Sequence, residues 1–250
     1  MIKELDPDYI NVDPLEQTYH ESIIEVPERV EALKAHNTAL LCIDMQYLDA
    51  APGHGVFADA TNNDVPVEAQ EYYFSVLKNT VFPNVRKLQD CFRSNGLEVI
   101  HVRIQSLTQD GRDRSTGHKM LNLLATPGSK EAEFIEEVAP VGDEIVMNKT
   151  SSGVFTSTNL FYVLKNLDID SLFVTGVYTN ECVSTTVRDA CDLGFLVTTI
   201  EDGCASVTHE LHDFTIATLK ARYTRVMTAN EAIEEIQRHC QPNRRTVKPS

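Results

Sequence analysis

Short apolar runs alternate with longer amphipathic stretches from Thr38 onward, which is typical of repeated strand and helix units around a parallel sheet. Strands buried on both faces of such a sheet are nearly continuous in apolar residues, as in ALLCI before Asp44 and SLFVTGV at 171–177. The pattern predicts strands at residues 39–44, 98–104, 144–147, 171–175, 195–200 and 225–228. Such a set of strands makes an open sheet of ordinary size.

Helices are predicted between these strands. Apolar residues recur at three- and four-residue steps from Tyr73 to Phe92, which predicts one long helix that ends at Gly96 and is kinked by Pro83. Further helices are predicted at residues 158–167, 179–193, 209–221 and 230–239. The second strand is instead followed by a long charged loop, residues 105–128. Loops of this length are usually functional or disordered, and this one follows a strand's carboxyl end, where open α/β sheets bind ligands.

The two ends of the chain depart from this pattern. Residues 1–37 are polar and interrupted by proline, and we interpret them as an arm that wraps the domain or a neighbouring subunit. Residues 38–239 are assigned to one domain, because 42% hydrophobic residues in a chain of 250 are enough for a single large core. Residues 240–250 are interpreted as a C-terminal tail.

The balance of charge narrows the range of partners. With 37 acidic and 22 basic residues the net charge is -15, a field that repels phosphate backbones and anionic lipid surfaces. Nucleic acid and membranes are therefore not expected as partners, and no apolar run reaches the roughly 20 residues that cross a bilayer. The acidic, proline-containing start of the sequence does not resemble a secretion signal, so we expect a cytoplasmic protein.

The cysteines are scattered without CxxC pairs, which indicates neither a zinc knuckle nor a disulfide framework. They are Cys42, Cys91, Cys182, Cys191, Cys204 and Cys240. Because free cysteine is among the most buried residue types, five of them are interpreted as small buried hydrophobes and one as a reactive thiol.

Charged side chains stand at the ends of two predicted strands. Asp44 ends an apolar strand, where burial would raise the pKa of its carboxyl and suit it to accept and return a proton. Capping of the next turn explains the same position equally well. Lys149 follows the strand at 144–147, where its charge could hold Asp44 ionised and lower the pKa of a thiol. A lone lysine is more often a solvated surface charge.

Cys182 is the most informative position. It follows a strand and a polar turn in which Thr179 or Asn180 is a plausible N-cap, and so falls in the first turn of a predicted helix. Unpaired N–H groups and the helix dipole would there stabilise a thiolate or an oxyanion. A buried structural cysteine is the alternative. Together with Asp44 and Lys149, this position favours nucleophilic attack on a carbonyl.

Three segments resemble the signature blocks of the isochorismatase-like cysteine hydrolases: IDMQ at 43–46, NKTSSGVF at 148–155 and VTGVYTNECVSTTVRDACDLGF at 174–195. The resemblance implies a three-layer α/β/α fold with a doubly wound, six-stranded parallel sheet. It also implies a catalytic centre of Asp44, Lys149 and Cys182. The implied reaction is hydrolysis of an amide, ureido or similar C–N bond through a thioester acyl-enzyme, in which Asp44 moves the proton.

The resemblance further implies a non-proline cis peptide bond between Val177 and Tyr178, with the N–H groups of Tyr178 and Cys182 as the oxyanion hole. The D-x-H metal motif of nicotinamidases in this superfamily is missing after His101, so we expect no metal and no cofactor. Isochorismatases often lack the nucleophilic cysteine, which favours amidase chemistry here. Isochorismatase activity on a vinyl ether, a metal-dependent hydrolase and a non-catalytic binding protein remain alternatives. The family also implies a homo-oligomer, a dimer or tetramer.

A small-molecule substrate is expected near the loop at 105–128. Its residues Arg112, Arg114, His118 and Lys119 could bind a substrate carboxylate or face solvent. Phe155 either walls the pocket or packs in the core. Gln46, Tyr178 and Asn180 are further candidates for the pocket lining.

Overall fold

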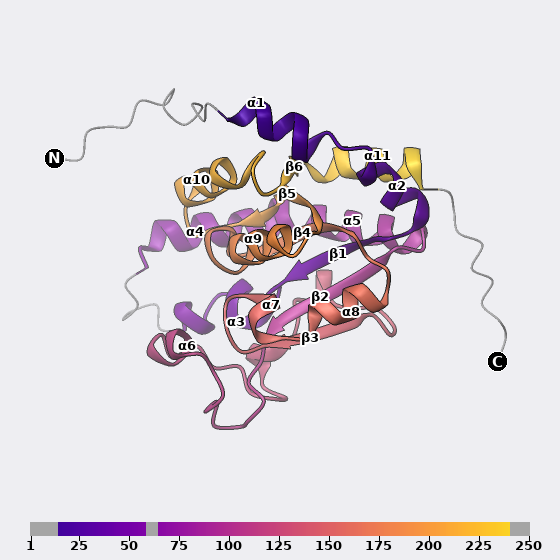
Figure 1. The fold of residues 1–250 in the computed structure, drawn as a ribbon. Coiled ribbons are helices and arrows are strands. Elements are labelled where there is room, and N and C mark those ends of the chain that lie inside the picture. Colours follow the sequence, from indigo (N-terminus) through magenta and orange to yellow (C-terminus); the bar gives the residue numbers. More distant parts are fainter. Residues whose placement is uncertain (1–14, 59–64, 241–250) are drawn as a thin grey trace.

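The computed structural model describes residues 15–58 and 65–240. Parallel strands form one 6-stranded sheet, in the order β3-β2-β1-β4-β5-β6 (Figure 1). They are β1 (Thr38–Ile43), β2 (Glu98–Ile104), β3 (Ile145–Lys149), β4 (Ser171–Val177), β5 (Leu196–Ala205) and β6 (Arg225–Met227). Every predicted strand is present, and the doubly wound fold is confirmed, with its topological switch between β1 and β4.

β5 differs most from its predicted length, because it continues past Ile200 to Ala205. The segment at 201–203 reads EDG, and these polar residues conceal the continuation in the sequence pattern. The register of β5 with β4 shifts between Val174 and Gly176, so the pairing absorbs the additional residues as an irregularity.

Helices cover both faces of the sheet (Figure 1). One face is covered by α2 (Glu28–Ala35), α4 (Val67–Val76), α5 (Phe82–Ser94) and α11 (Ala229–His239), and the other by α7 (Val154–Ser157), α8 (Leu160–Asn166), α9 (Ser184–Asp192) and α10 (His209–Leu219). Side chains of β1 alternate between the two cores: Leu40 and Cys42 enter the first, Leu41 and Ile43 the second. β1 is thus buried on both faces, as its apolar sequence predicts.

The long helix predicted before β2 is not a single kinked α-helix. A π-helical turn, η4 (Leu77–Val81), joins α4 to α5, and the Phe82 N–H donates to the Leu77 carbonyl. The irregular turn falls immediately before Pro83, which cannot donate a main-chain hydrogen bond. Proline therefore causes a wide turn at the place where a kink was expected.

The described part of the N-terminal arm packs on its own domain. It contains α1 (Glu16–Tyr19), a π-helical turn η2 (His20–Ile24) and α2. Arg29 of α2 is 3% exposed and donates to the carbonyls of Ile24 at 2.9 Å and Val197 of β5 at 3.0 Å. The rest of the arm, residues 1–14, and the tail at 241–250 lie outside the described residues.

Short helical turns occupy the connections at the carboxyl edge of the sheet and nearby. They are α3 (Tyr47–Ala50), η3 (Gly55–Phe57), α6 (Thr116–Met120), η5 (Lys130–Ala132) and η6 (Glu136–Val138). None of the helices within residues 15–58 and 65–240 is long and apolar enough to cross a membrane.

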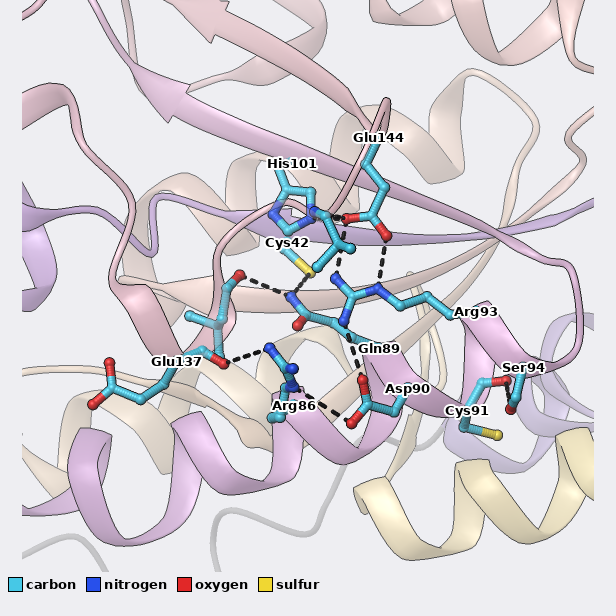
Figure 2. A network of polar contacts seen from close by, with 12 residues as sticks. Cys42, Arg86, Gln89, Asp90, Cys91, Arg93, Ser94, His101, Glu137 and Glu144 are labelled. Atoms are coloured by element: carbon cyan, nitrogen blue, oxygen red, sulfur yellow. Dashed lines mark hydrogen bonds and ion pairs between the residues drawn. The ribbon is translucent and has the colours of Figure 1, made fainter.

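A polar network joins α5 to the β2–β3 edge of the sheet (Figure 2). Arg93 of α5 donates from Nε at 2.7 Å and from Nη2 at 3.0 Å to the two carboxylate oxygens of Glu144, just before β3. The buried His101 ring of β2 lies 3.0 Å from Glu144 Oε2. Gln89, also on α5, donates to the Val138 carbonyl at 3.0 Å. Glu144 therefore connects the helix to two strands.

We expect Glu144→Gln to lower the free energy of unfolding by about 2 kcal/mol, because it removes a bidentate charged pair but keeps the side chain's size. Burial raises the pKa of Glu144, but hydrogen bonds from Arg93, the Val141 N–H and His101, together with the charge of Arg93, outweigh burial and lower that pKa. The pair's contribution is thus present above the unfolded pKa and is lost as pH falls through the folded pKa. Urea unfolding of parent and variant should differ at neutral pH and converge in acid. Asp90→Asn removes a more exposed partner of Arg93 and should cost less than about 1 kcal/mol; equal losses in the two variants would contradict the prediction.

Candidate active site

The strand ends bring the predicted catalytic side chains together. Asp44 directly follows β1 with a φ of 54°, and its N–H donates to the Val102 carbonyl of β2 at 2.9 Å. A positive φ is uncommon outside glycine, but aspartate tolerates it better than most residues. Lys149 is the last residue of β3, and Cys182 lies in the π-helical turn η7 (Thr179–Val183) after β4. The site thus forms at the carboxyl edge, beside the topological switch.

Lys149 contacts both of the other groups. Its Nζ lies 2.9 Å from Asp44 Oδ2 and 3.2 Å from Cys182 Sγ, and donates to the Ser151 carbonyl at 3.0 Å. Asp44 and Lys149 are 0% exposed and Cys182 is 4% exposed. A nucleophile, a carboxylate and a cation therefore share one buried site.

Burial has the largest influence on the protonation of this centre. Burial raises the pKa of Asp44, although the charge of Lys149 and its hydrogen bond to Asp44 lower that pKa. Burial also raises the pKa of the Cys182 thiol well above its ordinary value. The charge of Lys149 lowers that pKa, and the charge of Asp44 raises it. Burial lowers the pKa of Lys149, but its interactions with Asp44 first and Cys182 second outweigh burial and raise that pKa. The centre therefore holds an ion pair between Lys149 and Asp44 beside a neutral thiol.

This protonation state corrects the expectation that Lys149 and a helix start favour a thiolate at Cys182. Burial of the thiol and the negative charge of Asp44 oppose the stabilisation by Lys149. Cys182 also lies in a π-helical turn, one residue before the Val183 N-cap of α9. A neutral thiol needs a base to become a nucleophile, and Asp44 is the neighbouring carboxylate that can serve.

The turn that precedes Cys182 has an unusual backbone. The peptide bond between Val177 and Tyr178 is cis, at the position that the resemblance implies. Gly176 has a φ of 130°, and a Cβ atom there would lie 2.1 Å from the Ile43 carbonyl oxygen. Only glycine permits this close approach of β4 to the end of β1.

Three predicted pocket residues have other contacts. Gln46 donates to the carbonyls of Ile104 at 2.9 Å and Glu131 at 2.8 Å and accepts from the Ile104 N–H at 2.6 Å, so its amide holds loops together. The Phe155 ring stacks on Phe195 with centroids 5.9 Å apart and packs against the second core. Asn180 lies beside Cys182 in η7, and its Oδ1 accepts from Ser206 Oγ at 2.8 Å.

The basic residues of the loop at 105–128 differ in their contacts: three of them bond within the loop, and His118 is buried near Lys149. Arg112 is exposed and pairs with Asp110 at 3.1 Å, and Lys119 donates to the Arg112 carbonyl. Arg114 donates to the carbonyls of Gly111 and Leu123. These contacts all lie within the loop, and binding of a substrate carboxylate by Arg112, Arg114 or Lys119 stays a prediction. His118 is 5% exposed, and burial, followed by the charge of Lys149, lowers its pKa to about 4. Of the four, His118 is the one in electrostatic contact with the centre.

Asp49 is a site residue that sequence reasoning missed. It is 3% exposed in the short helix α3, and burial followed by the charge of Asp44 raises the pKa of its carboxyl well above the ordinary value. An acidic residue five positions after Asp44, within a run of otherwise apolar character, was the available signal. Among residues 15–58 and 65–240, no three His, Cys, Asp or Glu side chains are grouped as metal ligands.

One family model and several known proteins are similar to this chain. Residues 38–231 match the model described as the isochorismatase domain. The chain is 27% identical over 206 residues to the ureidoacrylate amidohydrolase RutB of Rhizobium rhizogenes, which covers 75% of the chain and 77% of that protein. It is 31% identical over 124 residues, 46% of each protein, to the N-carbamoylsarcosine amidase of an Arthrobacter species. The crystal structure of an isochorismatase-like hydrolase from Alkaliphilus metalliredigens superimposes with a TM-score of 0.59 at 27% identity, over 79% of this chain and 97% of that one.

Proposed function

This chain belongs to the isochorismatase family, and on that basis we propose that it is a hydrolase that cleaves an amide or ureido C–N bond of a small molecule through a thioester on Cys182. The observation that carries the proposal is the buried contact of Lys149 with both Asp44 and Cys182. Two of the similar proteins are named as an amidohydrolase and an amidase, which supports the same class of bond.

Asp44 is the proton carrier in the proposed reaction. It takes the proton of the Cys182 thiol as sulfur attacks the substrate carbonyl carbon, and it returns that proton to the nitrogen as the C–N bond breaks. The amine or ammonia leaves, and the acyl group remains on sulfur. Asp44 then removes a proton from water, the resulting hydroxide attacks the thioester, the C–S bond breaks, and the proton passes to sulfur.

Lys149 supports these steps by its positive charge, and the turn with the cis peptide bond supports them by its main-chain N–H groups. The raised pKa of Lys149 keeps its ammonium charged throughout, so it stabilises the thiolate that forms on Cys182 and the carboxylate of Asp44 in turn. In the proposed oxyanion hole, the main-chain N–H groups of Tyr178 and Cys182 face the substrate oxygen. The Tyr178 N–H makes no main-chain hydrogen bond among the described residues, which leaves it available.

Ammonia release from a panel of primary amides and monosubstituted ureas tests this proposal. Substrate-dependent release should saturate, and acid quenching should trap an acyl group on the peptide that contains Cys182, as detected by mass spectrometry. Both signals should be absent from Cys182→Ala. A panel that yields neither ammonia nor adduct, or ammonia release that survives in Cys182→Ala, would contradict the proposal.

A further inference from the structure

Asp49 is a second buried carboxyl, and its charge acts on the proposed nucleophile Cys182. Its Oδ2 atom is buried and has no hydrogen-bond partner in the described part of the chain. Its main-chain carbonyl accepts hydrogen bonds from the Tyr73 hydroxyl at 2.9 Å and the Tyr178 hydroxyl at 3.3 Å. Because Tyr178 belongs to the turn that carries Cys182, these bonds hold α3 against the site.

The Asp49 carboxyl is in electrostatic contact with the whole centre. The charge of Asp49 contributes to the rise in the pKa of Cys182, and the charges of Asp44 and Lys149 both act on Asp49. Burying a carboxyl without a partner costs free energy, which a ligand with a complementary group can recover. An unpaired, buried carboxyl oxygen on a residue whose charge acts on the nucleophile therefore points to a group on the substrate.

The charges around the site indicate whether the substrate group that meets Asp49 is positive or negative. Lys149 is already paired with Asp44 at 2.9 Å, and its charge lowers the pKa of Asp49 by less than burial and the charge of Asp44 raise it. Glu181, exposed on the same turn as Cys182, adds another negative charge. Arg112 and Arg114 are engaged with groups of their own loop. A substrate anion would oppose ionisation of Asp49 still further, whereas a substrate cation would stabilise the Asp49 carboxylate.

We propose that Asp49 is the specificity-determining residue of this site and pairs with a positively charged group of the substrate, a primary ammonium, guanidinium or amidinium. The inference rests on the proposed hydrolase function and narrows its substrate to cationic amides or ureides. Ionised Asp49 then forms with the substrate cation the ion pair that the free site lacks, and this pair orients the scissile carbonyl toward Cys182.

Methanethiosulfonates of different charge test this directly at Cys182. The thiolate attacks the reagent's sulfenyl sulfur, which forms a mixed disulfide and releases methanesulfinate. Rates for the 2-aminoethyl (cationic) and methyl (neutral) reagents are measured by mass spectrometry of the Cys182 peptide. The cationic-to-neutral rate ratio should fall about tenfold in Asp49→Asn, which keeps the size of the side chain but removes its charge. Asp143→Asn, the same substitution at an exposed position, should keep the parent ratio. An unchanged ratio in Asp49→Asn would overturn the inference.

Three ureas with matched chains separate this inference from the proposed function: (4-aminobutyl)urea, butylurea and 4-ureidobutanoate. We expect kcat/KM to fall in that order, and Asp49→Asn to raise KM for the cationic urea about tenfold with a smaller change in kcat. Hydrolysis of all three at similar kcat/KM would overturn the charge selection and leave the hydrolase proposal intact. Failure of all three, together with a Cys182 that no methanethiosulfonate modifies, would contradict both.

Discussion

Cys182→Ala should lower kcat by about 10⁴-fold or more, and Asp44→Asn by about 10³-fold, for whichever amide or ureide the parent hydrolyses. Alanine removes the atom that forms the thioester. Asparagine keeps the shape of Asp44 but cannot accept the thiol proton, and burial keeps that thiol neutral in the free enzyme. Steady-state ammonia release measures both losses.

Cys191→Ala is the matched control for the cysteine substitution. Cys191 lies on α9, is only partly buried and is not part of the centre, so its removal should leave kcat within about twofold of the parent. Because Asp44→Asn leaves the buried Lys149 without its ionic partner, its fold must be checked by circular dichroism. A folded Asp44→Asn protein with parental kcat would contradict the role of Asp44 as proton carrier.

Gly176→Ala should lower the free energy of unfolding by about 3 to 5 kcal/mol, the largest stability effect that we expect from one substitution outside the centre. Its Cβ would lie 2.1 Å from the Ile43 carbonyl oxygen, and the flanking atoms are main chain that cannot move aside without shifting β1. The φ of 130° adds backbone strain for alanine. Urea unfolding followed by circular dichroism gives the free energy, and a fall in melting temperature of roughly 10 °C should accompany it.

Gly142→Ala separates the two causes of that loss. Gly142 also has a positive φ, 66°, but a Cβ atom there meets nothing within 4 Å. This variant should therefore lose only about 1 kcal/mol from backbone strain. If Gly176→Ala loses no more than Gly142→Ala, the close contact with Ile43 does not determine the structure of the turn.

The sequence predicts the sheet well because burial on both faces leaves a strong pattern. β1 and β4 are buried at every position, and their apolar runs are nearly unbroken. The sheet order then places the ends of β1, β3 and β4 at one edge, which explains why strand ends together with the family resemblance could group residues as distant as Asp44 and Cys182. The strand at β5 is predicted, but its length is not, because polar residues continue it to Ala205.

The remainder of the site depends on contacts between segments that the sequence pattern does not relate. The charge of Arg114 predicts carboxylate binding, and the sequence does not reveal that its Nε and Nη1 atoms donate to the carbonyls of Gly111 and Leu123. Asp49 follows Asp44 within an otherwise apolar run, but the sequence does not show that it is 3% exposed or that Tyr73 and Tyr178 donate to its carbonyl. The direction of the Cys182 pKa likewise follows from burial, which a position at the start of a helix does not reveal.

The pH dependence of Cys182 alkylation by iodoacetamide, in the parent and in Asp44→Asn, tests the coupled centre most directly. Peptide mass spectrometry isolates the rate at Cys182 from that at the other cysteines. Burial raises the pKa of the Cys182 thiol most, Lys149 lowers it, and the charge of Asp44 raises it. Removal of the Asp44 charge should therefore shift the alkylation profile to lower pH by at least about one unit. The Asp44→Asn variant would then be alkylated faster than the parent near neutral pH, although its kcat should be about 10³-fold lower. A profile that is unchanged, or that moves to higher pH, would contradict a centre in which Asp44 and Lys149 control the thiol of Cys182.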